Sequence, residues 1–223
     1  DAVLFSHFHS DHSADFPVLV KSSHFEANPR KRLLPVYGPV GSALMPSTTE
    51  FLAGFFNEKT GIFRYLGEAG NEKTYEFEPH DVKLEAIEIQ PVFDKDGLRI
   101  SATTVIHAKI PSLAFLVEVQ GKKIAFSGDG NGNNGNLQKI ALGAGMLIAH
   151  LAIDDSFHFG ERSLHAPPGL IGEIADEAKV KQLVLAHRRP ETLGKETELQ
   201  SVIAKKYKGP IAFADDLGCF VVN

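Results

Sequence analysis

The sequence predicts an α/β (α+β) fold in which mixed β-sheets are covered by helices. Alternating apolar and polar residues at 82–89, 98–106 and 112–119 are typical of antiparallel strands that bury one face. Short continuous apolar runs at 146–150 and 182–187 indicate buried strands, and a segment with helical periodicity precedes each of them. Hydrophobic residues make up 43% of the 223 residues and charged residues 23%, which favours a globular chain with a sizeable core.

The N-terminal part begins inside an apolar strand, 1–5, that runs directly into a histidine-rich segment. A short helix is expected at 15–20, a strand at 33–39 that ends at glycine and proline, and a helix at 46–56. The region of antiparallel strands is expected to begin at Tyr75. Because the chain opens on a strand and without methionine, we expect an N-terminal segment to precede it.

The C-terminal part alternates helices and strands, and its first strand, 124–129, ends on the carboxylate of Asp129. Its other expected elements are helices at 137–142, 167–179 and 195–206 and strands at 210–213 and 218–222. Glycine and asparagine fill segment 130–136, which is expected to be an exposed loop. No repeat or linker divides the chain, so a single domain of residues 1–223 is expected.

Composition disfavours two classes of partner. The net charge of −5, without a long lysine or arginine block, predicts no large electrostatic surface for nucleic acid. No apolar run approaches the roughly 18 residues of a membrane-spanning helix. Cys219 is the only cysteine, so an intrachain disulfide is excluded, and this is compatible with the expected cytoplasmic location.

Four potential metal ligands, His7, His9, Asp11 and His12, fall within six residues. Imidazole nitrogens and a carboxylate form the ligand set that zinc and similar divalent ions accept. In an extended segment His7 and His9 point the same way, while a turn after His9 can direct Asp11 and His12 to a second ion. The spacing therefore favours two ions, against the alternative of ordinary loop residues.

The segment from Leu4 to His12 resembles the His-x-His-x-Asp-His signature of the metallo-β-lactamase superfamily. His107 after a strand, Asp129 in Ser-Gly-Asp, and His187 at a strand end resemble the later metal motifs of that superfamily. The resemblance implies a four-layer αβ/βα sandwich, with two mixed sheets packed face to face and helices outside. Members normally place further strands before the first motif, so one sheet edge is expected to be open here. Either the N-terminus is incomplete, or a partner chain covers that edge, in which case a homodimer is the hypothesis.

By this resemblance seven residues hold two divalent metal ions. One ion would be bound by His7, His9 and His107, the other by Asp11, His12 and His187, and Asp129 would bridge them. The ions are expected to be zinc, although the same ligand types serve manganese and iron. A hydroxide that bridges the ions would be the nucleophile.

The expected catalytic residues are Asp11, which is also a ligand, and His165. His165 stands where the ribonuclease Z-like branch carries a His-Ser-Thr motif, and it is the candidate acid for the leaving group. A histidine in a surface loop is the alternative for this position. Four histidines without a surrounding motif are treated as non-ligands: His24, His80, His150 and His158.

Segments 35–39, 112–115 and 174–187 are most similar to the ribonuclease Z-like group, which includes tRNA 3′-processing nucleases and enzymes of smaller phosphodiesters and sulfate esters. Three departures count against a tRNA nuclease: Leu-Ala-Ile at 151–153 in place of Glu-Ala-Thr, Ala-Pro after His165 in place of Ser-Thr, and Arg-Arg-Pro at 188–190 in place of Phe-Ser-Arg. A protruding arm that grips tRNA is also missing.

We therefore expect a binuclear metal-dependent hydrolase of a small phosphodiester or similar anionic ester, with nucleic acid and membranes disfavoured as partners. Arg188 and Arg189 are candidates to pair with the anionic group, unless they are solvated surface residues. Asp154 and Asp155 could line the pocket that binds the substrate or belong to a turn. The alternatives are a tRNA 3′-processing endonuclease, a lactonase or thioesterase, and a non-catalytic metal-binding module.

Overall fold

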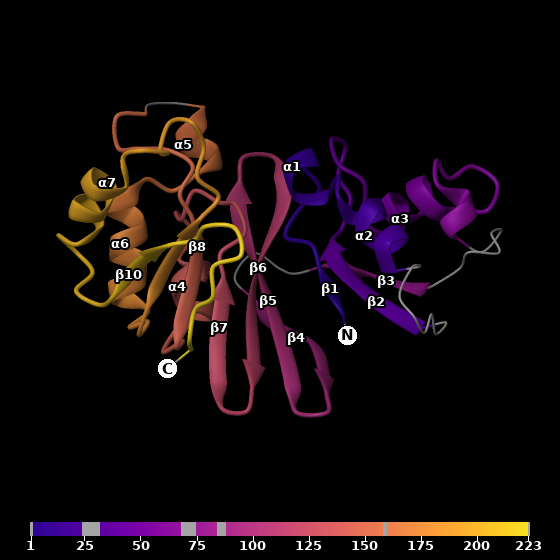
Figure 1. Ribbon diagram of the computed structural model, residues 1–223, viewed down its shortest axis with the longest axis horizontal. Coiled ribbons are helices and arrows are strands. Elements are labelled where there is room, and N and C mark those ends of the chain that lie inside the picture. The colour runs from indigo at the N-terminus through magenta and orange to yellow at the C-terminus, as the bar shows by residue number, and fades with distance from the viewer. Residues whose placement is uncertain (1, 24–31, 68–74, 84–87, 158–159, 223) are drawn as a thin grey trace. The chain divides into compact units, whose positions relative to one another are not determined.

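The computed structural model describes residues 2–23, 32–67, 75–83, 88–157 and 160–222. The chain divides into two compact units, Asp1–Lys83 and Leu84–Asn223, and each carries one β-sheet (Figure 1). Helices and strands alternate in both units, so the predicted mixed α/β class with two sheets is confirmed. The single domain of residues 1–223 stays a prediction. Among the described residues no helix is long and apolar enough to cross a membrane.

Unit 1 holds a three-stranded sheet in the order β1-β2-β3, in which all strands are parallel. The strands are β1 (Val3–Leu4), β2 (Arg32–Pro39) and β3 (Tyr75–Val82). The helices are α1 (Ser10–Ser13), α2 (Phe16–Ser23), α3 (Thr48–Phe56) and the 3-10 helix η1 (Arg64–Leu66). The expectation that the antiparallel region begins at Tyr75 is wrong, because a helical crossover between β2 and β3 returns the chain in the same direction.

Helix α3 starts at Thr48, two residues after the expected start, because Ser47 forms a capping box with Glu50. The Ser47 hydroxyl accepts a hydrogen bond from the Glu50 N–H, and Glu50 Oε2 accepts one from the Ser47 N–H at 2.8 Å. These contacts satisfy two backbone donors that the first turn of a helix leaves without partners. The core of this unit is largely aromatic, with residues Phe5, Phe8, Phe16, Phe51 and Phe56.

Unit 2 holds a seven-stranded sheet in the order β10-β9-β8-β7-β6-β5-β4 (Figure 1). Its antiparallel part comprises β4 (Ile89–Lys95), β5 (Leu98–His107), β6 (Ile110–Val119) and β7 (Lys122–Phe126). Its parallel part continues from β7 through β8 (Met146–His150), β9 (Leu183–Ala186) and β10 (Ile211–Phe213). The helices are α4 (Asn136–Ile140), α5 (Glu161–Leu164), α6 (Pro168–Glu177) and α7 (Glu196–Ile203).

Two strand predictions need correction. The predicted strand at 218–222 does not form, and Val221 in this segment is 77% exposed, so its apolar residues do not contribute to a sheet or core. The predicted strand at 82–89 is divided between the end of β3 and the start of β4, and its residues 84–87 lie outside the described part of the chain.

The glycine- and asparagine-rich segment 130–136 was expected to be exposed, and this is wrong for most of it. The side chains of Asn134 and Asn136 both donate to the backbone carbonyl of Thr104, at 3.0 and 2.9 Å. Gly130 lies so close to β5 that a Cβ atom there would meet the Val105 side chain at 3.0 Å. Asparagine amides therefore supply the hydrogen bonds that allow this polar segment to be buried.

The packing of α6 on α7 predicts a sharp difference between two glycines of the same helix. A Cβ atom at Gly172 would lie 2.7 Å from the carbonyl oxygen of Ile203, whereas one at Gly169 would meet nothing closer than 3.6 Å. We expect Gly172→Ala to lower the free energy of unfolding by about 1–2 kcal/mol, since overpacking exceeds the gain in helix propensity. Gly169→Ala, the matched control, should leave stability unchanged or raise it.

Urea denaturation of both variants measures this difference. Equal stability of the two variants would show that α6 and α7 can separate at little cost, and the close packing at Gly172 would then not contribute to stability.

Candidate metal centre

The histidine motif of unit 1 leaves the sheet just after β1, where the Phe5 N–H still bonds the Tyr37 carbonyl at 2.8 Å. Phe8, in the middle of the motif, is buried and stacks on Phe51 of α3 with ring centroids 4.4 Å apart. Because successive side chains of an extended segment point to opposite sides, burial of Phe8 in the core directs His7 and His9 to the other side. The phenylalanine thus anchors the motif.

Four predicted ligands come together in this unit. His7 Nε2 lies 3.1 Å from His9 Nδ1, and the ring centroids of His7 and His12 are 4.2 Å apart. Two nitrogens bound to one tetrahedral zinc would lie about 3.3 Å apart, given bond lengths of about 2.0–2.1 Å. The pair of histidines therefore has the spacing of two ligands of one ion. Asp11 Oδ2 lies 3.5 Å from His12 Nε2.

In unit 2 the predicted ligands lie at strand ends. Strands β5 and β7 are both antiparallel to β6, while β8 and β9 are parallel to β7. These four strands run in one direction, so their carboxyl ends meet at the same edge of the sheet. The residues at or just after these ends are His107, Asp129, His150 and His187.

His107 is oriented in the way that metal-binding histidines usually are. Its ring is 1% exposed, and its Nδ1 lies 2.8 Å from the carbonyl oxygen of Leu164, to which it donates a hydrogen bond. This bond selects the tautomer in which Nε2 carries the lone pair. Nε2 is then the atom through which His107 could bind a metal ion.

Asp129 is 3% exposed and lies among histidines. Its Oδ2 is 3.5 Å from His187 Nε2 and 3.8 Å from His165 Nδ1. His107, Asp129 and His165 each offer one ligand atom within 4.8 Å of the others. His187 follows β9 with a φ of 53°, a left-handed conformation that is uncommon for a residue other than glycine and that often marks a functional site.

His165 is buried, 5% exposed, so the alternative of a surface-loop histidine is wrong. Its ring lies among three other histidines, with centroid distances of 5.3 Å to His107, 5.5 Å to His150 and 5.9 Å to His187. Nδ1 is buried without a hydrogen-bond partner among the described residues. Burial lowers the pKa of His165 to about 3.

His150 was expected to be a non-ligand, and both of its ring nitrogens are engaged by the chain. Nε2 accepts a hydrogen bond from the Ala166 N–H at 3.2 Å, and Nδ1 lies 3.2 Å from Ser127 Oγ. Burial lowers the pKa of His150 to about 4. His80 belongs to unit 1, where it stacks on Tyr37, while His24 and His158 lie outside the described residues.

Arg188 fits neither of the two expectations for it. Its guanidinium donates to Glu196 Oε1 at 2.7 Å, to the Ala214 carbonyl at 2.8 Å and to the carboxylate of Asp215. The hydrogen bond to Asp215 raises the pKa of Arg188. This arginine is neither solvated nor directed at a ligand, because acidic groups of its own chain neutralise it.

Neighbouring charges are paired in the same way. Arg189 lies 3.2 Å from Glu161 Oε2, and Lys195 Nζ lies 2.8 Å from Asp154 Oδ2. The hydrogen bond from Lys195 lowers the pKa of Asp154 to about 2. Asp155 is exposed. These pairs belong to the surface of unit 2, and the structure offers no substrate-binding role for them.

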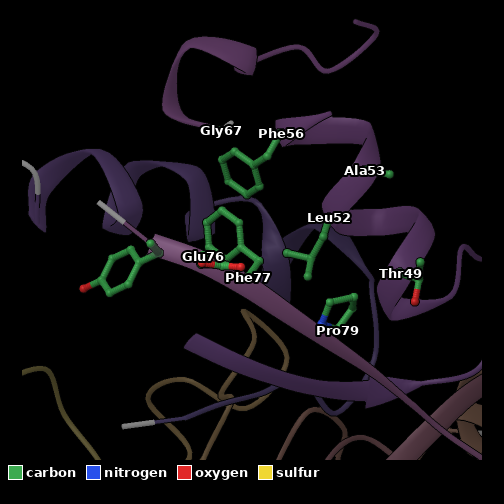
Figure 2. A pocket seen from close by; sticks show the side chains of 9 residues that line it. Thr49, Leu52, Ala53, Phe56, Gly67, Glu76, Phe77 and Pro79 are labelled. Atoms are coloured by element: carbon green, nitrogen blue, oxygen red, sulfur yellow. The ribbon is translucent and has the colours of Figure 1, made fainter. Parts of the chain in front are cut away.

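A pocket of about 220 Å³ lies in unit 1 between α3 and β3 (Figure 2). Its walls are mostly apolar, and Phe56 and Phe77 stack in it with ring centroids 4.6 Å apart. No residue of the histidine motif lines this pocket. The pocket is therefore separate from the predicted metal ligands of this unit.

Comparison with known proteins places the chain in a family. The model of the family described as "Beta-lactamase superfamily domain" matches residues 1–188. The chain belongs to the metallo-β-lactamase superfamily. The superfamily and the ribonuclease Z-like branch predicted from the motifs are thereby confirmed.

Curated relatives of this superfamily member include ribonuclease Z of Mycolicibacterium paratuberculosis, 28% identical over 227 residues, and ribonuclease Z of Mycobacterium marinum, 29% identical over 229 residues. Each alignment covers 97% of this chain and 77% of the relative.

Solved structures show the fold. The short form of human tRNase Z aligns with a TM-score of 0.71 at 20% identity, over 100% of this chain and 79% of that one. The metallo-β-lactamase fold protein YhfI of Bacillus subtilis aligns with a TM-score of 0.67 at 20% identity, over 96% of this chain and 75% of that one. Yeast PDE1 aligns with a TM-score of 0.66 at 14% identity, over 96% of this chain and 66% of that one. The predicted αβ sandwich class is thus confirmed.

Proposed function

We propose that this chain is a metal-dependent hydrolase that cleaves a small phosphodiester or a similar anionic ester. The observation that carries the proposal is the convergence of ligand atoms in each unit, with His7 Nε2 3.1 Å from His9 Nδ1 and Asp129 Oδ2 3.5 Å from His187 Nε2. Membership of the metallo-β-lactamase superfamily and its ribonuclease Z relatives support hydrolysis as the reaction class.

The proposed centre holds two divalent ions. In the order of the superfamily motifs, His7, His9 and His107 would bind one ion, Asp11, His12 and His187 the other, and Asp129 both. Imidazole nitrogens and carboxylate oxygens suit zinc, and also manganese or iron. When bound, two such cations would lower the pKa of a water molecule and polarise the ester.

His165 is proposed to donate a proton to the leaving-group oxygen. Its buried Nδ1 lies 3.8 Å from the proposed bridging carboxylate of Asp129, so the ring is within reach of a group bound there. An ester with a negative charge beside the ring would favour its protonated form. Asp11, whose side chain is 63% exposed, is proposed to orient water as well as to bind an ion.

The charge distribution supports a small substrate. The net charge is −5, and the two arginines after His187 are paired with acidic groups of the chain. A long polyanion would therefore find few cations here. A tRNA 3′-processing endonuclease is the second candidate, and its support is the relationship to ribonuclease Z across 97% of the chain.

Metal analysis combined with hydrolysis of bis(p-nitrophenyl) phosphate tests the proposal. We expect about two ions per chain, with turnover that chelation abolishes and added zinc or manganese restores. Less than one ion per chain after such addition would contradict the binuclear centre and favour a non-catalytic module. An aryl sulfate, a lactone, a thioester and a precursor tRNA complete the substrate panel, and faster cleavage of the tRNA than of all small esters would favour the second candidate.

A further inference from the structure

The segment that carries His165 is hydrogen-bonded to residues at or just after the ends of three strands, β5, β7 and β8. The carbonyl of Ser163 accepts from the Ala108 N–H at 2.9 Å, just after β5. The carbonyl of Leu164 accepts from His107 Nδ1 at 2.8 Å, at the end of the same strand. The Ala166 N–H is shared between the Gly130 carbonyl, at 2.9 Å, and His150 Nε2, at 3.2 Å. His165 is therefore held by contacts on both sides of it in the chain.

His150 is the side chain that joins this segment to the residues between β7 and Asp129. Ser127 follows β7 directly, and its hydroxyl donates to the Gly128 carbonyl at 2.6 Å. The same oxygen accepts the His150 N–H at 3.1 Å and lies 3.2 Å from His150 Nδ1. Since the hydroxyl has only one proton, Nδ1 must be the donor in the last contact.

The opposite ring nitrogen requires the same tautomer. Nε2 can accept from the Ala166 N–H only if it carries no proton. His150 is therefore neutral, with its proton on Nδ1, and both nitrogens are used. This arrangement excludes a metal at His150, and it leaves the ring as a rigid link between two segments that carry site residues.

We propose that His150 is a positioning residue that sets the place of His165 relative to Asp129. The two atoms whose separation it controls are His165 Nδ1 and Asp129 Oδ2, which lie 3.8 Å apart. The inference rests on the proposed function in so far as this separation matters for catalysis. A reacting group displaced by about 1 Å can lose roughly 100-fold in rate, so a link of this kind affects turnover without touching the substrate.

Two substitutions separate positioning from simple core packing. In His150→Gln the amide oxygen can replace Nε2 as acceptor for the Ala166 N–H, whereas His150→Leu keeps a similar volume without any hydrogen bond. We expect His150→Leu to lower kcat for bis(p-nitrophenyl) phosphate by about 10-fold or more, with KM and metal content little changed. His150→Gln should recover most of the rate.

Nuclear magnetic resonance tests the link without relying on turnover. Long-range proton–nitrogen spectra of the wild-type protein should show His150 with its proton on Nδ1. The ring signals of His165 and the amide signal of Ala166 should shift in His150→Leu and stay near their wild-type positions in His150→Gln.

A proton on Nε2 of His150, or unchanged His165 signals in both variants, would overturn the proposal. Equal and measurable kcat values in all three proteins would also overturn it. If no protein turns over any substrate while the spectra change as expected, the positioning link stands and the proposed function fails. If His150→Leu does not fold, the tautomer of His150 in the wild-type protein and the spectra of His150→Gln still test the positioning role.

Discussion

Replacement of Asp129 by alanine is expected to abolish turnover and to release at least one of two bound metal ions. The carboxylate is buried, and its Oδ2 lies 3.5 Å from His187 Nε2, so its loss would remove a negative charge from the proposed centre. Loss of a residue that only supports a ligand costs roughly 10–100-fold in metal affinity, and loss of a bridging ligand should cost more. Metal content and the rate of phosphodiester hydrolysis measure the effect.

Asp94→Ala is the matched control, because it removes an exposed carboxylate on the edge strand β4 that pairs with Arg99 of β5 at 3.0 Å. Its metal content and turnover should equal those of the wild type. Two firmly bound ions in Asp129→Ala would contradict the bridging role.

Replacement of His165 by alanine should lower kcat by about 100-fold while both metal ions remain bound. Proton donation by a well-placed side chain typically contributes about 10²–10⁴-fold, and the His165 ring lies 3.8 Å from Asp129. The loss should depend on the leaving group. An alkyl phosphodiester, whose leaving oxygen needs a proton, should suffer more than the p-nitrophenyl ester, whose leaving group is stable as an anion.

His80→Ala is the control for this experiment, because it removes a histidine that stacks on Tyr37 in unit 1. Equal losses for both leaving groups would remove the proton-donor role. Loss of metal in His165→Ala would instead indicate that His165 is a ligand, in line with its closeness to His107 and Asp129.

Local patterns in the sequence were sufficient to name the candidate ligands. His7, His9, Asp11 and His12 lie within six residues, so their approach needs only a strand end, a turn and the burial of Phe8. Apolar runs likewise placed Asp129 and His187 at the ends of strands. In this sheet, parallel strands bring such ends to one edge whatever the details of packing.

Errors arose where burial depended on partners far away in the chain. The asparagines of 130–136 look solvent-exposed by composition, yet Asn134 and Asn136 are held by the Thr104 carbonyl some 30 residues earlier. The apolar run 218–222 looks like a strand, but it has no strand partner in the described structure. Strand pairing is a property of two segments, so one segment alone cannot predict it.

Residue type and short-range periodicity are sufficient to predict the mixed α/β class, the family signature and the seven candidate ligands. The partners of His150 and Arg188 could be assigned only from the folded structure. A lone histidine at a strand end and an arginine after a ligand are ambiguous until their partners are known. Those partners, Ala166 for His150 and Asp215 for Arg188, are brought close by folding, and a buried polar group takes its role from the groups that satisfy it.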